Sequence, residues 1–122
     1  MNMETGPEAV LGIPFARNSY PMWIYDCETF AFLEVNNAAI RQYGYSREEF
    51  LRMSIRDIRP TADVPELLRQ TDTPRPLGKS TAERWRHQAK SGTVFEVTIT
   101  SWELTFCGCP AEMVLARREG PQ

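Results

Sequence analysis

The chain has 122 residues, of which 42% are hydrophobic and 25% are charged, and its net charge is -2 at neutral pH. This length predicts one domain with a core of its own, and the hydrophobic fraction excludes an intrinsically disordered chain. Acidic and basic residues are interspersed without a long basic run, which argues against direct binding of nucleic acid.

The first 20 residues do not have the pattern of a secretory signal peptide or of a membrane-spanning helix. The opening MNMETG carries an acid and no base, and the longest apolar stretch, residues 9–16, is broken by Gly12 and Pro14. Three cysteines are an odd, low number for a disulfide-stapled secreted fold. We therefore expect a cytoplasmic protein, without membrane contact by this segment. We divide it into an N-terminal segment with a short helix (1–20), a folded domain (21–119) and a tail (120–122).

The folded domain begins with a predicted hairpin. Met22–Asp26 and Ala31–Val35 are aromatic and β-branched runs separated by four residues, which favours an antiparallel pair. Asn36 or Asn37 then begins a helix. We interpret Asn36 as its N-cap, whose side-chain oxygen accepts an amide hydrogen of the first turn, and Asn37 as an exposed first-turn residue. Gly44 ends the helix.

Short helical segments follow. Ser46 and Glu49 have the spacing of a capping box, which predicts the start of a second helix. Ser54–Ile58 predicts one further turn, and Asp63–Gln70 another small helix. The Pro- and Gly-rich residues 71–80 predict a loop.

From Thr81 the apolar period becomes two, which predicts strands. Trp85 and His87 share one face of the first strand, and Ser91-Gly92 forms a turn. In the next strand the apolar residues switch from odd to even numbers, which predicts a β-bulge near Thr100-Ser101. The switch separates Phe95, Val97 and Ile99 from Trp102, Leu104 and Phe106.

The last strand is predicted at residues 112–117, after a turn over residues 107–110. Strands and helices do not alternate one for one along the chain. This order predicts an α+β fold, in which an antiparallel sheet carries helices on one face.

The chain resembles the PAS family in three segments. These are Val35-Asn36 leading into the first helix, Tyr43–Phe50 (YGYSREEF), and Lys90–Val97 (KSGTVFEV), where Ser91 stands in place of the usual Asp. The resemblance covers about residues 20–118 and implies a five-stranded sheet of order 2-1-5-4-3. It implies a sensory and dimerisation domain of a bacterial signalling protein. A sensor histidine kinase is the favoured parent, and a cyclic-dinucleotide enzyme or a transcription regulator is the alternative.

The resemblance also implies an interior pocket between sheet and helices that holds a small ligand. The same apolar lining fits an ordinary filled core, so the alternative is a ligand-free protein-interaction module. The candidate lining residues are Trp23, Tyr25, Leu33, Tyr43, Phe50, Met53, Ile55, Ile58, Leu67, Leu68, Val97, Ile99, Trp102 and Met113.

Two cofactors of the family are tested by single residues. Flavin photosensors carry a reactive cysteine in the segment that matches Ser54–Ile58, which has none, so a flavin photoadduct is excluded. Haem sensors place a histidine in the helix that matches Asp63–Gln70, which also has none, and this argues against haem. The cofactor is therefore left unknown.

Other chemistry has weaker support. Cys107 and Cys109 could form part of a zinc site with His87, but a fourth ligand is missing. The two thiols alone could form a redox pair. The favoured interpretation is that all three are ordinary side chains, with His87 half-exposed on its strand. No phosphate loop, HExxH or GxSxG motif is present, so we do not expect catalysis by the domain itself.

The sequence also carries predictions about self-association and about the connection to an effector domain. An apolar start (Val10, Leu11, Ile13 and Phe15) and an outward sheet face carrying Phe32 and Val114 predict a homodimer. Arg118, Glu119 and Gly120 stand where many relatives carry Asp-Ile-Thr. We expect the connection to the effector to lie beyond these residues or to be missing.

Overall fold

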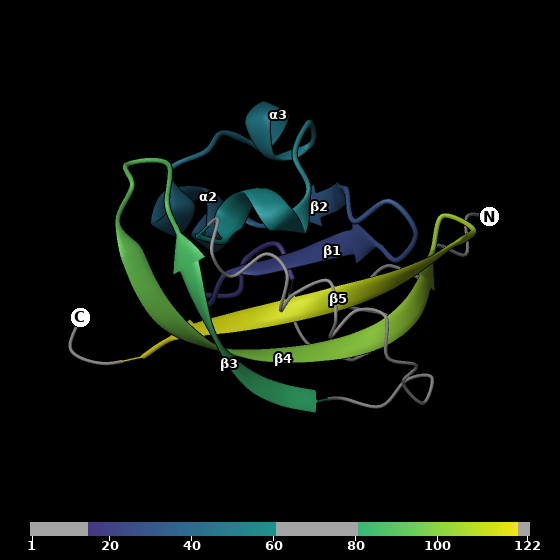
Figure 1. The fold of residues 1–122 in the computed structure, drawn as a ribbon. Coiled ribbons are helices and arrows are strands. Elements are labelled where there is room, and N and C mark those ends of the chain that lie inside the picture. The colour runs from purple at the N-terminus through teal and green to yellow at the C-terminus, as the bar shows by residue number, and fades with distance from the viewer. Residues whose placement is uncertain (1–14, 61–80, 120–122) are drawn as a thin grey trace.

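The computed structural model describes residues 15–60 and 81–119. Within them, a five-stranded antiparallel sheet in the order β2-β1-β5-β4-β3 carries two short helices and a 3-10 helix on one face (Figure 1). The predicted fold class and strand order are confirmed. The elements are β1 (Met22–Asp26), β2 (Phe32–Val35), α2 (Asn37–Tyr43), α3 (Arg47–Phe50), η1 (Ile55–Ile58), β3 (Thr81–Gln88), β4 (Val94–Phe106) and β5 (Cys109–Arg118).

The long strand β4 pairs without a break on both sides. Residues 94–101 pair with β3 and residues 97–106 pair with β5, one partner after another. The bulge predicted near Thr100-Ser101 is therefore wrong. The irregular register lies between β1 and β2: the neighbours Ile24 and Tyr25 pair with Glu34 and Phe32, so Leu33 is an extra residue in β2.

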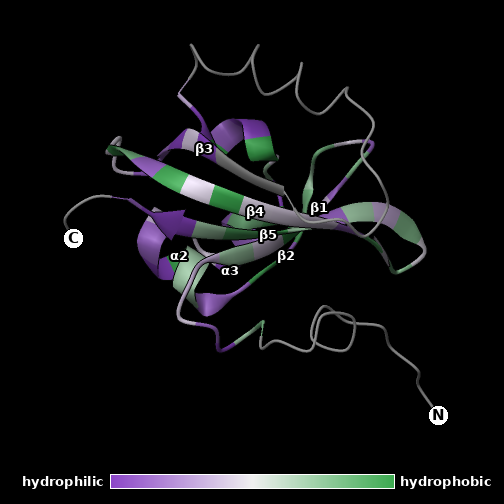
Figure 2. Ribbon diagram, turned by 90° about the horizontal axis from the view of Figure 1, so that it is seen from below, coloured by the Kyte–Doolittle hydropathy of each residue, from purple (hydrophilic) through white to green (hydrophobic). Residues whose placement is uncertain are grey.

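The apolar period changes in β4 because both faces of the sheet are covered. Phe95, Val97 and Ile99 belong to the helix-side core, the cluster of buried residues between sheet and helices. Leu104 belongs to a second cluster on the opposite face, called here the outer cluster. A strand that pairs without a bulge and is buried on both faces presents apolar residues of both parities. Figure 2 shows the alternating apolar and polar bands along β4. The outer cluster comprises Phe15, Met22, Ile24, Leu104, Ala111 and Met113, with Leu33, Trp102, Phe106 and Leu115 packed against it.

The same alternation corrects the expected dimer face. Phe32 and Val114 are 2% and 4% exposed and belong to the helix-side core, so the prediction that they face outward is wrong. Phe15 is also buried, against the outer cluster. One apolar residue of the N-terminal segment therefore packs on the folded domain itself.

The helix ends follow their predicted caps. Gly44 has φ +84 and its N–H donates to the Ile40 carbonyl at 3.0 Å, which closes α2. Ser46 and Glu49 form the predicted capping box of α3. Ser54 and Asp57 form a further capping box at η1, which is not among the predicted caps.

The β4–β5 connection is a tight hairpin. Cys107 and Gly108 have φ of 50 and 82, as the two-residue hairpin turn with positive φ requires, and Phe106 pairs directly with Cys109. β5 therefore begins earlier than predicted.

Several expectations lie outside the described residues: the helix at 63–70, the loop at 71–80 and most of the N-terminal segment. In the part of the chain that is described, no helix has the length and apolar character needed to cross a membrane.

Candidate functional site

The helix-side core is built largely from aromatic rings in edge contact. Ring centroids lie 5.9 Å apart for Trp23 and Phe32, 5.6 Å for Trp23 and Tyr43, and 5.0 Å for Phe32 and Phe50. Such pairs contribute roughly 0.5–1.5 kcal/mol each beyond the area they bury. The interior between sheet and helices therefore has walls of fixed geometry.

Most of the predicted lining residues meet in this core. Those present are Trp23, Tyr25, Tyr43, Phe50, Ile55, Ile58, Val97 and Ile99, with Met53 packed against them. Leu33, Trp102 and Met113 belong to the outer cluster instead, because alternation along their strands turns them to the opposite face. This corrects their expected position. Leu67 and Leu68 lie outside the described residues.

A polar pair is buried inside the core. The hydroxyl of Tyr43, at the end of α2, lies 2.5 Å from Nδ1 of His87 on β3, and both side chains are 0% exposed. The prediction of a half-exposed His87 is wrong. Its neighbours Arg84 and Arg86 are exposed on the other face of the strand, whereas His87 shares its face with Trp85. The alternation of exposed arginines with Trp85 and His87 is the sequence feature that indicates a buried His87.

Burial keeps both members of the pair neutral. Removal from water raises the pKa of Tyr43 well above its ordinary value, against a smaller opposing effect of the Arg59 charge. Removal from water also lowers the pKa of His87 well below 6.5, and the Arg59 charge lowers it further. Among the described residues, the other ring nitrogen of His87, Nε2, is buried without a hydrogen-bond partner.

Two guanidinium groups border the same part of the core. That of Arg59, just after η1, lies 3.9 Å from the ring centre of Trp85, and that of Arg118, at the end of β5, lies 4.5 Å from the ring centre of Phe95. Both charges act on Tyr43, because each lowers its pKa against the effect of burial. Two guanidinium groups therefore border this end of the interior.

A second buried polar contact joins β1 to β5. The Tyr25 hydroxyl donates to Oε1 of Glu112 at 2.9 Å, and the two residues are 5% exposed each. Tyr25 belongs to the helix-side core. The interior thus holds polar groups at more than one point of its apolar wall.

Asn36 fixes the corner between β2 and α2. Its Oδ1 accepts from the Ala39 and Met22 amides at 3.0 and 2.9 Å, and its Nδ2 donates to the Phe15 and Tyr20 carbonyls at 2.9 and 3.0 Å. The predicted N-cap is confirmed, and the same side chain also holds the start of β1 and the segment before it.

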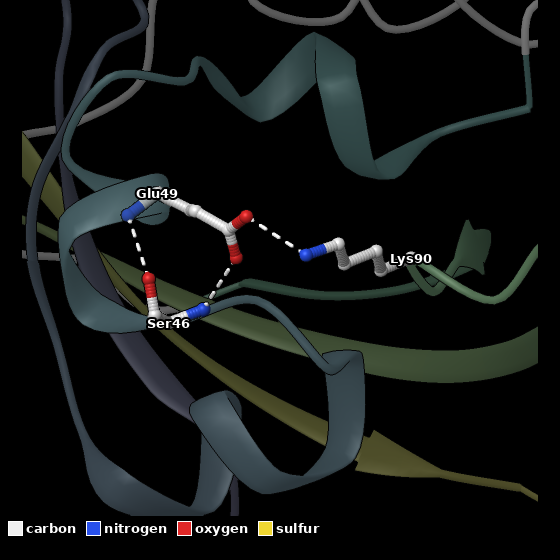
Figure 3. A network of polar contacts seen from close by, with 3 residues as sticks. All are labelled: Ser46, Glu49 and Lys90. Carbon is white, nitrogen blue, oxygen red and sulfur yellow. Dashed lines mark hydrogen bonds and ion pairs between the residues drawn. The ribbon is translucent and has the colours of Figure 1, made fainter.

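The β3–β4 turn is tied to the helices by a polar network (Figure 3). Nζ of Lys90 lies 2.8 Å from Oε2 of Glu49, whose other oxygen accepts from the Ser46 amide at 2.8 Å. The hydrogen bond from Lys90 lowers the pKa of Glu49, with a smaller contribution from the Ser46 backbone. The Lys90 amide also donates to the Tyr43 carbonyl at 2.8 Å. These contacts hold the end of β3 next to Tyr43.

The cysteines lie far from His87. His87 pairs with Phe95 near one end of β4, and Cys107 follows its other end, about 40 Å farther along the strand at roughly 3.3 Å per residue. A shared zinc set is therefore excluded, and residues 15–60 and 81–119 contain no group of three or more potential metal ligands. The Cys27 amide donates to the Pro110 carbonyl, so all three cysteines lie at one end of the sheet, which the sequence analysis missed. A redox role for Cys107 and Cys109 stays a prediction.

Comparison with known proteins identifies the fold. No protein-family model and no curated protein matches the chain. Among solved structures, a PAS domain from a two-component sensor histidine kinase is 24% identical, with a TM-score of 0.68, over 85% of this chain and 88% of that one. The PAS domain of an HTR-like protein from Haloarcula marismortui is 16% identical, with a TM-score of 0.75, over 86% and 85%. The chain has the PAS fold.

A LOV protein from Rhodobacter sphaeroides is also similar. It is 13% identical, with a TM-score of 0.72, over 88% of this chain and 64% of that one. The missing cysteine in Ser54–Ile58 excludes only the covalent bond of a photoadduct. A flavin held without that bond therefore stays among the ligands to be tested.

Proposed function

We propose that this chain is a sensory PAS domain of a signalling protein, which binds a small molecule in its helix-side interior and relays the binding to an effector. A sensor histidine kinase is the parent we favour. The similarity in fold to a PAS domain from a two-component sensor histidine kinase supports this choice. We propose that the protein is cytoplasmic, because three cysteines are an odd, low number for a disulfide-stapled secreted fold.

The observation that carries the proposal is the buried Tyr43–His87 pair. A core that serves stability alone is apolar, because a buried polar group costs free energy unless its hydrogen bonds are complete. A ligand pocket combines an apolar wall with a few polar groups that fix orientation. The interior has this composition, and one polar atom of the pair is left without a partner among the described residues. This favours a ligand site over the ligand-free interaction module.

Native mass spectrometry of the purified protein tests the proposal. We expect a retained small molecule, and an absorption spectrum of the same sample identifies a flavin if that is the ligand. The matched control is Leu51→Ala, an exposed substitution at the residue that follows α3, which should not change retention. A ligand-free mass, with no interior amide shifted by a library of small molecules, supports the interaction module instead.

We also propose that the domain self-associates through the outer face of the sheet. Trp102 and Phe106 pack against the outer cluster and are only partly buried there. Sedimentation at tens of micromolar tests this. A purely monomeric chain, unchanged by removal of residues 1–18, contradicts it.

A further inference from the structure

The protonation state of the Tyr43–His87 pair follows from its chemistry. A phenol is a stronger acid than a neutral imidazole N–H, so the favourable contact has the Tyr43 hydroxyl donating to Nδ1 of His87. A neutral ring with an accepting Nδ1 carries its hydrogen on Nε2. The unpartnered Nε2 of His87 is therefore an N–H donor.

Such a donor is costly if nothing accepts from it. Unmade hydrogen bonds of buried groups are rare in folded proteins, and each calls for an explanation. The ring cannot turn to solvent, because it packs 5.7 Å from Trp23 and 5.6 Å from Tyr43, centroid to centroid. The Nε2 hydrogen is thus held in place for an acceptor that the described residues do not supply.

The surroundings select the kind of acceptor. The guanidinium groups of Arg59 and Arg118 stack on Trp85 and Phe95, and Phe95 is the strand partner of His87. A nearby positive charge favours an anion over a neutral acceptor, and hydrogen bonds to ionised acceptors are roughly twice as strong. An apolar, ring-lined wall with one N–H donor, on which the Arg59 charge acts, matches a small organic carboxylate.

We propose that His87 Nε2–H is the anchor for the carboxylate of a small molecule bound in the helix-side interior. This inference rests on the proposed sensory function and names its ligand class. His87 sets the specificity, and Tyr43 positions it by holding Nδ1 as the acceptor.

Nuclear magnetic resonance can observe this site directly, because His87 is the only histidine of the chain. A ¹⁵N-labelled sample of the full chain shows a single imidazole, and its two nitrogen shifts report the tautomer. The probes are sodium formate, sodium acetate and sodium benzoate, with nitrobenzene as a neutral isostere of benzoate. The variant His87→Phe removes the N–H donor and keeps an aromatic ring. The variant Tyr43→Phe removes the hydroxyl that donates to Nδ1, so that the imidazole hydrogen is no longer confined to Nε2.

We expect the free protein to carry its imidazole hydrogen on Nε2. At least one carboxylate should shift Nε2 and its proton in a saturable manner. If benzoate is that carboxylate, it should bind at least tenfold more tightly than nitrobenzene, and His87→Phe should remove that tenfold preference. Tyr43→Phe should weaken carboxylate binding and yield a mixture of tautomers. If His87→Phe does not fold, the wild-type titration still decides.

Three results overturn the inference. A hydrogen on Nδ1 contradicts the assigned donor. Nitrobenzene, or a molecule retained on purification, could shift the amides of Phe95 and Val97 without shifting Nε2. That result would show that His87 does not anchor the ligand, while the proposed sensory function would still hold. If no carboxylate shifts Nε2 and no compound shifts the interior amides, both proposals fail.

Discussion

Replacement of Asn36 by alanine is the sharpest test of how the corner beside the interior is held. The side chain is 2% exposed and makes four hydrogen bonds: two accepted from the Ala39 and Met22 amides and two donated to the Phe15 and Tyr20 carbonyls. Alanine removes all of them at once.

The magnitude follows from two of these contacts. Loss of a helix N-cap costs about 1 kcal/mol. The Met22 amide lies at a position of 0% exposure, so losing its acceptor adds about 1–3 kcal/mol. We expect Asn36→Ala to lower the free energy of unfolding by about 2–4 kcal/mol. The neighbouring Asn37 is exposed, and Asn37→Ala should stay within about 0.5 kcal/mol of wild type.

Urea unfolding at fixed pH measures the difference, provided that the slope of the transition is the same in all variants. Asn36→Asp is the matched control. Asp caps a helix as well as Asn does, but it cannot donate to the Phe15 and Tyr20 carbonyls. If the cap alone matters, Asn36→Asp will match wild type. Alanine variants at 36 and 37 that unfold within 1 kcal/mol of each other would refute the four-bond account.

The remaining predictions concern one titration and two local contacts. The pKa of His87 is lower in the folded than in the unfolded protein, so its contribution to stability is complete above about pH 6.5 and falls as the pH drops below that value. Urea midpoints between pH 7.5 and 5 should show this loss, with a slope up to about 1.4 kcal/mol per pH unit larger than in His87→Phe. Lys90→Met removes an exposed ion pair with Glu49, so the urea midpoint should fall only slightly and the loss should disappear in high salt; a loss that persists there contradicts this. Gly44→Ala should cost about 1–2 kcal/mol in thermal unfolding because φ is +84, although the new Cβ would meet the Lys90 Cβ at an ordinary 3.6 Å; no shift of the midpoint contradicts the left-handed backbone.

Features that depend on one turn of chain were predicted correctly from the sequence. The cap at Asn36, the Ser46–Glu49 box and the helix end at Gly44 each join groups three or four residues apart. Both partners of such a contact lie close together in the sequence, so the contact can be predicted without knowledge of the tertiary structure. The strand order came from the family resemblance and was confirmed by the structure.

Assignments of sheet faces were less successful, for a physical reason. Alternation shows which residues of a strand share a face, but it does not show what covers that face. The outer face at the far end of β4 is covered by a cluster that includes Phe15, far away in sequence. Without knowledge of that cover, the change of parity at Trp102 predicts a bulge. Phe32 shares the helix side with Val35 because the β1–β2 register shifts at Leu33, which the sequence does not reveal.

His87 shows the same limit at the site itself. Its burial depends on Tyr43, 44 residues earlier, and neither residue alone indicates a binding group. The Lys90 amide and side chain hold the strand end against the helix through Tyr43 and Glu49, and this fixes the position of the histidine donor. In the proposed site, a ligand that accepts from His87 would bind to β3, whose strand partner β4 pairs in turn with β5, the last strand of the chain. The chemistry of recognition and the route of a signal would then share one strand.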